Sequence, residues 1–368
     1  MKICFYNVTA SIIQGGLETY CWEAGRALAR RGHQVSIVAG AGGEPRHREV
    51  ELLRFPFRRE QAWPDLGTRF RRLMERLSFA QHSLSHLVGA GYDAVIVNKP
   101  FDFPILWQAR RRGLAAQTIY RSGGTEFYFG DRYFSSSIDH WLSTSRYNAA
   151  QVKAHYGRRV QVVHNGVDVD HFRPMQREST LRQSLGLPDG ARVIASVGRL
   201  VGWKGLRVIL ELLPRLSQEV HFLVIGEGPE EPKLREQSAR LGVAERVHFC
   251  GRIVHEQLPQ ALAQADILVQ PSLGEESFGI TLVEAMACAL PVLASRQGGM
   301  TEIVLPGVTG DLLPPGDVDA WRETIAQMLT QPDRTRAMGA AGRERAVAEF
   351  TWAANAAKLE RLLQEGRS

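Results

Sequence analysis

The chain alternates strand-like apolar runs with helical patterns along almost its whole length, and this alternation most limits how it can fold. Runs such as KICFYNV and RVIASVG are each followed by a longer segment whose apolar residues recur at helical spacing. Successive parallel strands need a crossover connection, which is usually a helix. We therefore expect an α/β fold with two doubly wound parallel sheets, each wrapped by helices on both faces.

The strand-like runs fall into two groups. Five lie in the first half, namely KICFYNV, VSIVAG, DAVIVN, QTIYRS and VQVVHN. Six lie in the second half, namely RVIASVG, HFLVIG, VHFCG, ADILVQPS, PVLAS and GDLLPP. Two sheets of ordinary size account for this number of strands.

Domain boundaries follow from the stretch NGVDVDHFRPMQREST at residues 165–180, where apolar periodicity lapses and turn-forming residues cluster. We expect one Rossmann-like domain over residues 1–170 and a second over residues 171–349. The chain ends with the amphipathic pattern FTWAANAAKLERLLQ. We expect this helix, within residues 350–368, to pack back on the first domain.

Composition is that of an ordinary globular protein, with 44% hydrophobic and 23% charged residues. No apolar run reaches the roughly 18 residues that a membrane-spanning helix needs. The N-terminus leads directly into a strand-like pattern without the layout of a signal peptide. We therefore expect a cytoplasmic protein. The four cysteines are far apart in the sequence, which argues against a zinc site and a disulfide framework.

The net charge of +6 is unevenly distributed. Residues 1–165 contain 23 Lys and Arg against 13 Asp and Glu, and the remainder has an excess of acidic residues. Much of the positive charge lies among aromatic and leucine residues at 55–84, in Arg58, Arg59, Arg69, Arg71, Arg72 and Arg76. Such a segment is typical of a peripheral contact with an anionic membrane surface, and equally of a solvated helix whose leucines enter the core. No nucleic-acid-binding motif accompanies it.

Four loops have the composition of phosphate-binding turns between a strand and a helix. The first contains Gly15 and Gly16, which let the backbone approach a phosphate at a helix N-terminus. Alone, such a pair is more often a tight turn. The second, SVGRLVGWKGL, places Arg199 and Lys204 on either side of a turn that begins at Gly198. An arginine fork and a lysine point charge together suit a diphosphate, although isolated surface cations are more often merely solvated.

The third loop, EESFGITLVE, carries the carboxylates Glu276 and Glu284. We expect Ser277 to cap a helix that starts near Phe278 or Gly279, whose N–H groups then face a ligand. Carboxylates accept hydrogen bonds from pairs of sugar hydroxyls, so the two glutamates are candidates for a hexose and a ribose. The alternative is a carboxylate that compensates the helix dipole and another that is salt-bridged in the core.

The fourth loop, SRQGGMTEIV, has another glycine pair ahead of a helix. In open parallel sheets, ligands bind beyond the carboxyl ends of the strands, where loops lead into helix N-termini. Four loops of this kind with two cations and two carboxylates are not explained by folding alone. They predict a site for a phosphorylated, hydroxyl-rich ligand.

In this order and spacing the motifs resemble those of the family 4 glycosyltransferases, retaining enzymes of GT-B fold that use nucleotide-sugar donors. The resemblance covers nearly the whole chain. Its most diagnostic part is PSLGEESFGITLVEAMACALPVLASRQGGMTEIVLPGVTGDLLPPGD. It also includes QGGLETYCWEAGRALARRGHQVSIVAG, VVHNGVDVDHFRP, SVGRLVGWKGL and GEGPEEPKLREQSARLGVAERVHFCGRI.

The resemblance implies that residues 1–170 bind the acceptor and residues 171–349 the nucleotide-sugar donor. It also implies roles for single residues. Arg199 and Lys204 are implied to bind the donor diphosphate, Glu276 the transferred sugar and Glu284 the ribose. We assign Arg199, Lys204 and Glu276 as catalytic. The main chain at Ile253 is implied to meet the base.

Further donor-binding positions follow from the same resemblance. They are Gly15 and Gly16 over the phosphates, with Gly198, Ser277, Phe278 and Gly279. We expect no cofactor beyond the donor, a UDP-sugar ahead of a GDP- or ADP-sugar. We also expect no metal, because Asp-x-Asp is absent near these loops.

The acceptor side departs from the family pattern. Many members carry a histidine after the strand that corresponds to QTIY, where this chain has Arg121. The loop Asn98-Lys99-Pro100-Phe101-Asp102 resembles an acceptor-side loop of some lipopolysaccharide core transferases. Asp102 and Arg121 are therefore acceptor candidates, although Asp102 also suits an ordinary helix N-cap.

The sequence thus predicts a hexosyltransferase acting on a glycan, lipid-linked or phosphorylated acceptor in cell-envelope polysaccharide or lipopolysaccharide synthesis. A nucleotide-sugar epimerase or hydrolase with the same two-domain plan is the alternative. A non-catalytic sugar-binding protein is a third reading, which the joint presence of Arg199, Lys204, Glu276 and Glu284 disfavours.

Overall fold

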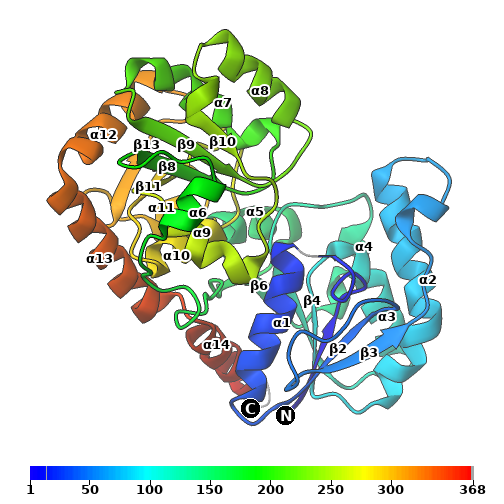
Figure 1. Cartoon of the computed structure of the whole chain (residues 1–368). Coiled ribbons are helices and arrows are strands. Elements are labelled where there is room, and N and C mark those ends of the chain that lie inside the picture. The colour runs from blue at the N-terminus through cyan, green and yellow to red at the C-terminus, as the bar shows by residue number, and fades with distance from the viewer. Residues whose placement is uncertain (14, 366–368) are drawn as a thin grey trace. The chain divides into compact units, whose positions relative to one another are not determined.

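The computed structural model describes residues 1–13 and 15–365. The chain divides into two compact units, one formed by residues 1–166 with 352–368 and the other by residues 167–351. Each unit contains one parallel sheet with helices on both faces (Figure 1). The predicted fold class, two Rossmann-like parallel-sheet domains, is confirmed.

The first unit contains a seven-stranded sheet in the order β3-β2-β1-β4-β5-β6-β7, and every adjacent pair of strands is parallel. Its strands are β1 Lys2–Tyr6, β2 Gln34–Gly40, β3 Glu51–Phe55, β4 Ala94–Val97, β5 Gln117–Ser122, β6 His140–Ser143 and β7 Gln161–Val162. Its helices are α1 Gly16–Ala29, α2 Thr68–Gly89, α3 Phe103–Arg111, α4 Asp131–Phe134, α5 Arg146–Tyr156 and α14 Trp352–Glu365.

The second unit contains a six-stranded parallel sheet in the order β10-β9-β8-β11-β12-β13. Its strands are β8 Arg192–Val197, β9 Val220–Ile225, β10 Val247–Phe249, β11 Ile267–Gln270, β12 Val292–Ser295 and β13 Gly310–Leu313. Its helices are α6 Ser179–Ser184, α7 Leu206–Leu212, α8 Glu231–Arg240, α9 Leu258–Leu262, α10 Ile280–Ala287, α11 Met300–Ile303, α12 Val318–Thr330 and α13 Pro332–Glu349.

Apolar clusters cover both faces of each sheet. In the first unit one cluster joins β1 and β2 to α1 and α14, and a second joins the same sheet to α2 and α3. In the second unit one cluster contains α10 and the other contains α7 and α12. Strands buried on both faces read as nearly continuous apolar runs, which is why the central strands were recognisable in the sequence.

Two strands and part of the linker differ from the sequence-based expectation. β3 is an edge strand with mostly half-exposed side chains, and β6 has the mixed sequence HWLS, so neither gives a strong apolar pattern. In the expected linker, Val167 and Phe172 are buried in the core of the second unit. The lapse in periodicity therefore marks irregular backbone inside that unit rather than a free linker of 16 residues.

The C-terminal helix α14 belongs to the first unit, although it follows the last helix of the second in sequence. Trp352, Ala356, Leu359 and Leu363 enter the cluster that also contains residues of α1. Figure 1 shows α14 beside α1. Residues 366–368 of the expected helix, like Gln14 of the first predicted loop, lie outside the described residues. In the part of the chain that the structure describes, no helix is both long and apolar enough to cross a membrane.

Candidate functional site

Three of the predicted loops follow strands that are neighbours in the sheet of the second unit. They leave the carboxyl ends of β8, β11 and β12, and these three strands are adjacent in the order β8-β11-β12. Because all are parallel, their carboxyl ends share one edge of the sheet, where ligands bind in folds of this kind. The topology therefore gathers these three loops at one edge of one unit.

Lys204 and Glu276 are brought together by these loops. Lys204 closes the short 3-10 helix Gly202–Lys204, and its ammonium forms an ion pair with the Glu276 carboxylate. The same carboxylate oxygen of Glu276 accepts a hydrogen bond from Gln270 at 2.9 Å and a longer one from Ser272 at 3.4 Å. The side chains of Lys204 and Glu276 are 18% and 13% exposed. A charge pair this well desolvated is strongly position-specific.

Arg199 lies beside this pair on the loop after β8. Its side chain is exposed, and with Gly198, Lys204 and Leu206 it lines a small hollow at the end of that strand. Gly198 has φ of 147°, and a Cβ there would lie 3.7 Å from the Lys204 ammonium. The arrangement thus keeps a guanidinium and an ammonium on one short loop, as a diphosphate site requires.

The helix after the third loop starts later than predicted and is capped differently. α10 begins at Ile280, and its N-cap is Gly279 with φ of 103° and no side-chain hydrogen bond. The prediction that Ser277 caps this helix is therefore wrong. Phe278 is buried in the core of the second unit, so only its backbone can serve a ligand. A left-handed glycine replaces the side-chain cap because it reverses the chain without a Cβ.

The glycine pair of the fourth loop packs on the backbone of the third. A Cβ added to Gly298 would lie 2.3 Å from the carbonyl oxygen of Glu276, and one added to Gly299 would lie 2.3 Å from that of Ser277. The Gly299 N–H donates to the Glu276 carbonyl at 2.8 Å. These glycines therefore fix the position of the Glu276 loop. They need not touch a ligand themselves.

Glu284 is almost fully buried in α10 and accepts a hydrogen bond from His255 Nε2 at 2.9 Å. His255 lies in the 3-10 helix His255–Gln257, two residues after Ile253, and its own side chain is half exposed. Ile253 packs against the core beside this helix. Sequence reasoning missed His255, although a histidine directly after the predicted base-contacting stretch GRIV was a usable signal.

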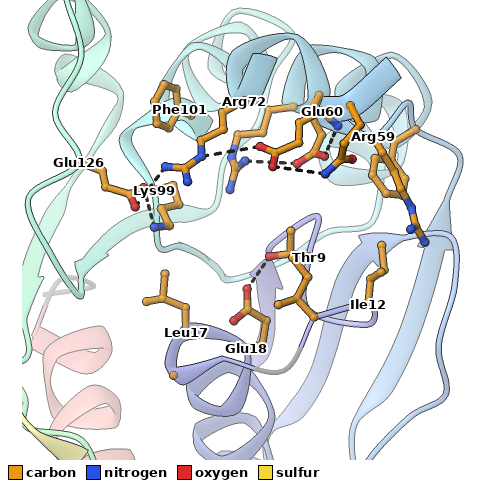
Figure 2. Close-up of a pocket in the computed structure, with 16 residues that line it drawn as sticks. Thr9, Ile12, Leu17, Glu18, Arg59, Glu60, Arg72, Lys99, Phe101 and Glu126 are labelled. Atoms are coloured by element: carbon orange, nitrogen blue, oxygen red, sulfur yellow. Dashed lines mark hydrogen bonds and ion pairs between the residues drawn. The ribbon is translucent and has the colours of Figure 1, made fainter. Parts of the chain in front are cut away.

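A cavity of about 540 Å³ lies wholly within the first unit (Figure 2). It is bounded by the loop after β1, the first turn of α1, the segment before α2, α2 itself and the loop after β4. The residues lining it are Thr9, Ile12, Ile13, Gly16, Leu17, Glu18, Phe57, Arg59, Glu60, Gln61, Arg72, Glu75, Arg76, Lys99, Phe101 and Glu126. Gly16 is the only donor-site candidate among these lining residues.

One side of the cavity has two cations around a carboxylate, and the opposite side has a hydroxyl and a carboxylate. Lys99 and Arg72 both contact Glu126, at 2.7 Å and 3.3 Å. On the opposite side, the Thr9 hydroxyl donates to the Glu18 carboxylate at 2.6 Å, and Figure 2 shows both side chains at the cavity wall. Sequence reasoning missed Glu18, Lys99 and Glu126 as a set because they are far apart in the chain.

Asp102 lies behind this cavity and does not line it. Its carboxylate is 2% exposed and forms an ion pair with Arg76 Nε at 2.9 Å. Burial raises the pKa of Asp102 to about 6, although Arg76 and Lys99 work in the opposite direction. Asp102 stands at the N-cap position of α3, but its side chain makes no capping hydrogen bond. Its contact with the cavity is therefore through Arg76.

Arg121 is buried at the end of β5, outside the cavity lining. Its guanidinium lies 3.7 Å from the centre of the Tyr20 ring and donates a hydrogen bond to Asn165. Burial lowers its pKa, with the neighbouring Tyr20 working in the opposite direction. A buried cation over an aromatic face is a stable arrangement, so the position can serve packing as well as a ligand.

The basic segment before and within α2 does not present all its arginines to solvent. Arg76 is buried and Arg72 lines the cavity, whereas Arg58, Arg59 and Arg69 are exposed. Three of the six arginines proposed for a membrane surface thus form ion pairs within the protein, namely Arg71, Arg72 and Arg76. The leucine-rich face of α2 enters the core, as the alternative expectation required.

Comparison with known proteins identifies the family. Residues 14–171 match the family described as Glycosyltransferase Family 4, and residues 177–345 match the one described as Glycosyl transferases group 1. The chain belongs to the family 4 glycosyltransferases. The predicted resemblance is thereby confirmed.

Among curated relatives, a "GDP-mannose-dependent alpha-(1-6)-phosphatidylinositol monomannoside mannosyltransferase" of Mycolicibacterium smegmatis is 36% identical over 64% of this glycosyltransferase chain and 65% of the relative. The chain thus matches slightly less than two thirds of that relative's length. A protein of the same description from Mycobacterium tuberculosis is 27% identical over 95% of both chains. A "D-inositol 3-phosphate glycosyltransferase" of Corynebacterium efficiens is 29% identical over 99% of this chain and 95% of its own.

Solved structures agree on the fold. A sucrose-phosphate synthase from Thermosynechococcus elongatus superposes with a TM-score of 0.84 at 23% identity, over 99% of this chain and 98% of its own. HepE of Anabaena in complex with UDP superposes with a TM-score of 0.82 at 22% identity, over 99% and 100%. At these identities the structural similarity supports the GT-B fold but no particular activity or substrate.

Proposed function

We propose that the chain transfers a hexose from a nucleotide-diphosphate sugar, bound by the second unit, to an acceptor bound by the first. The observation that carries this proposal is the Lys204–Glu276 pair with Arg199 at the shared edge of β8 and β11. Cations for a diphosphate and a carboxylate for sugar hydroxyls stand there side by side. That is the donor chemistry of a family 4 glycosyltransferase.

The donor is proposed to be a GDP-sugar, with GDP-mannose as the first candidate. The relatives that the chain matches first are named as GDP-mannose-dependent enzymes, which conflicts with the UDP-sugar expected from the sequence. In this proposal the main chain near Ile253 meets the base and Glu284, oriented by His255, accepts from the ribose hydroxyls. Thermal-shift titration with GDP and UDP tests the base, because binding raises stability with the logarithm of ligand concentration over Kd.

Catalysis in this proposal rests on charge at the leaving diphosphate. Breaking the glycosyl–phosphate bond places negative charge on the diphosphate, and groups aimed there lower the barrier because that charge grows in the transition state. Arg199 and Lys204 supply the positive charge. We expect the reaction to persist in EDTA, since these cations do the work that a metal ion does in other transferases.

The reaction is proposed to retain the anomeric configuration. A double displacement needs a carboxylate free to attack the anomeric carbon. Glu276 is instead held by Lys204, Gln270 and Ser272. Attack on the same face, with a leaving-phosphate oxygen taking the acceptor proton, fits this arrangement. Nuclear magnetic resonance of the product's anomeric proton checks it, and an inverted product would exclude it.

The acceptor is proposed to occupy the cavity of the first unit. The cavity offers carboxylates and a hydroxyl for polyol hydroxyls and cations for an anionic group. The relatives' names, which include D-inositol 3-phosphate and a phosphatidylinositol monomannoside, are consistent with such acceptors in the cell envelope. Asp102 then positions Arg76 at the cavity wall. Arg121 lies at the end of β5 and is proposed to orient the acceptor from there.

A peripheral membrane location is part of the same proposal. Arg58 and Arg69 are exposed, and Leu66 between them is 70% exposed. Such a patch suits an anionic bilayer that carries a lipid-linked acceptor. Replacing both arginines with glutamate should reduce sedimentation with phosphatidylglycerol vesicles. Unchanged sedimentation would remove this part of the proposal.

Transfer is distinguished from epimerisation or hydrolysis by one experiment. The protein is incubated with GDP-mannose alone and with GDP-mannose plus D-inositol 3-phosphate or phosphatidylinositol, and the sugar products are resolved by chromatography. A glycosylated acceptor supports the proposal. Epimerised or freely hydrolysed sugar at equal rates with and without acceptor supports the epimerase or hydrolase alternative.

A further inference from the structure

Two cations in the cavity of the first unit converge on a single carboxylate. Lys99 Nζ lies 2.7 Å from Glu126 Oε2, and Arg72 Nη1 lies 3.3 Å from Glu126 Oε1. Figure 2 shows the three side chains meeting at one end of the cavity. Although partial burial acts in the opposite direction, Lys99 and Arg72 lower the pKa of Glu126, so it is ionised at neutral pH. One carboxylate thus holds two cations that line an open cavity.

The backbone that presents Glu126 is fixed by aromatic stacking. Tyr128 stacks on Phe101 at 4.8 Å with an interplanar angle of 8°, and Phe127 stacks on His155 at 4.1 Å with an angle of 2°. The Glu126 side chain itself is 41% exposed. It can therefore leave the two cations by rotating toward solvent, without movement of the loop that carries it.

The neighbouring charges are bound more permanently. Arg76 is paired with the buried Asp102 carboxylate at 2.9 Å, and both side chains are less than a tenth exposed. Glu60 lies 3.8 Å from Arg72 Nε, farther than Glu126 lies from either cation. An anion that enters the cavity thus competes with Glu126 for Lys99 and Arg72, whereas the Arg76–Asp102 pair stays intact because separating it leaves a buried charge unpaired.

We infer that Lys99 and Arg72 form a subsite for a phosphate group of the acceptor, and that Glu126 occupies this subsite as an internal stand-in until the acceptor displaces it. An arginine fork and a lysine point charge bind a phosphate with more hydrogen bonds than one carboxylate offers. Thr9 and Glu18 on the opposite side meet hydroxyls of the same molecule. The inference rests on the proposed acceptor role of the cavity, and it makes Glu126 a determinant of acceptor affinity.

The test is binding of inorganic phosphate to the full chain by isothermal titration at constant ionic strength. Glu126→Gln keeps the size of the side chain but removes the competing charge. It should tighten phosphate binding by about fivefold, as expected for releasing two partly exposed ion pairs. Parallel titrations with methyl phosphate and dimethyl phosphate separate the two sources of such a group. If Glu126→Gln binds methyl phosphate more tightly than the wild type does, the natural ligand is a phosphorylated polyol. If it binds dimethyl phosphate more tightly, the natural ligand is a lipid headgroup.

Two further variants make the test specific. Glu60→Gln is the matched control, because the Glu60 carboxylate lines the same cavity but lies farther from Arg72, at 3.8 Å, than Glu126 does, and should change the affinity less than twofold. Adding Lys99→Met to Glu126→Gln should abolish the gain. The phosphate-binding loops of the second unit are identical in all variants, so differences between them report the cavity.

Equal affinity of the wild-type chain and Glu126→Gln would overturn the inference, as would a gain that survives Lys99→Met. Neither measurement requires transfer activity. A chain that shows the gain but transfers no sugar contradicts the proposed function alone. A chain that transfers sugar but shows no gain contradicts the anion subsite alone.

Discussion

Lys204 has two roles at the candidate donor site. It is proposed to face the leaving diphosphate, and it neutralises the mostly buried Glu276. Lys204→Ala removes a charge-assisted hydrogen bond worth roughly 1.5–3 kcal/mol. We therefore expect kcat to fall at least about tenfold. Steady-state kinetics with a GDP-sugar donor measure this.

Lys233→Ala provides the control for this prediction, because Lys233 is 73% exposed on α8 and forms an ion pair with Glu230. Its kcat should stay within about twofold of wild type. Equal losses in the two variants would show that general charge, rather than the position of Lys204, matters.

A pair of histidines in the second unit links its stability to pH. His221 Nδ1 and His248 Nε2 lie 2.8 Å apart. Burial, and to a smaller extent the charge of His221, lowers the pKa of His248 from 6.5 to about 4. Between these values the unfolded chain binds a proton that the folded chain does not. Stability from this pair is therefore present above about pH 6.5 and is lost as pH falls toward 4.

His248→Gln should reduce this pH dependence. The difference in Tm between pH 7.5 and pH 5 should shrink by about 2–4 °C, measured by scanning calorimetry. His82→Gln is the control, since His82 is exposed on α2 and should leave the difference unchanged. An unaltered pH dependence in His248→Gln would contradict the assigned cause.

Sequence reasoning at this scale found residues whose motif is local and missed those whose partners are distant. Lys204 and Glu276 each stand in a distinctive loop, and the parallel sheet brings those loops together. The loop that contains Lys99 was recognisable, but nothing in the sequence indicated Glu126 as its partner, because their contact depends on where two separate loops end in space. The Arg76–Asp102 pair likewise emerges only from the packing of α2 against the loop after β4.

At the scale of elements, the glycine pair after β12 supports the loop that carries Glu276. Gly298 has φ of 58°, and an added Cβ would lie 2.3 Å from the Glu276 carbonyl oxygen. Gly298→Ala should therefore lower the free energy of unfolding by about 1–3 kcal/mol beyond the cost of the left-handed backbone alone. It should also weaken donor binding, because the Glu276 loop must shift.

Gly307→Ala isolates the backbone cost. Gly307 has φ of 74° but no atom within 4 Å of an added Cβ. Gly307→Ala should lower the free energy of unfolding by about 1–2 kcal/mol and leave donor affinity unchanged. Urea unfolding of both variants measures the loss of stability, and nucleotide titration measures donor affinity. If both variants lost the same stability and affinity, contact with the Glu276 loop would be irrelevant.

Elements were predictable where burial gives a strong pattern. All six strand-like runs of the second half contain strands of the sheet, and the four inner strands, β9, β8, β11 and β12, read as continuous apolar runs because they are buried on both faces. In the first half, the edge strand β3 and the short β6 escaped notice. The cap of α10 was also mispredicted, since Ser277 and Gly279 both suit such a position and only geometry decides between them.

At the scale of the whole molecule, the chain crosses between its units twice, and this affects how each unit is stabilised. The expected boundaries were residues 170 and 349, whereas the units divide after Gly166 and after Thr351. Turn-formers cluster near the first of these divisions, in NGVDVDHFRPMQREST, but not near the second, where the sequence reads AVAEFTWAA. The sequence could not show that Val167 and Phe172 enter the second core, since isolated apolar residues in an irregular segment carry no periodic signal.

Because α14 belongs to the first unit, truncating one of its buried side chains should destabilise that unit selectively. Leu359 is fully buried in the cluster that includes residues of α1, β1 and β2. Leu359→Ala should cost about 2–5 kcal/mol, as truncation of a buried leucine does. Hydrogen exchange should show the loss of protection in β1, β2 and β4, while β8, β11 and β12 keep theirs, because α14 belongs to the first unit although it is last in the chain. Arg361→Ala, an exposed position on the same helix, should leave both sheets protected. A loss of protection in the sheet of the second unit alone would mean that α14 stabilises that unit instead.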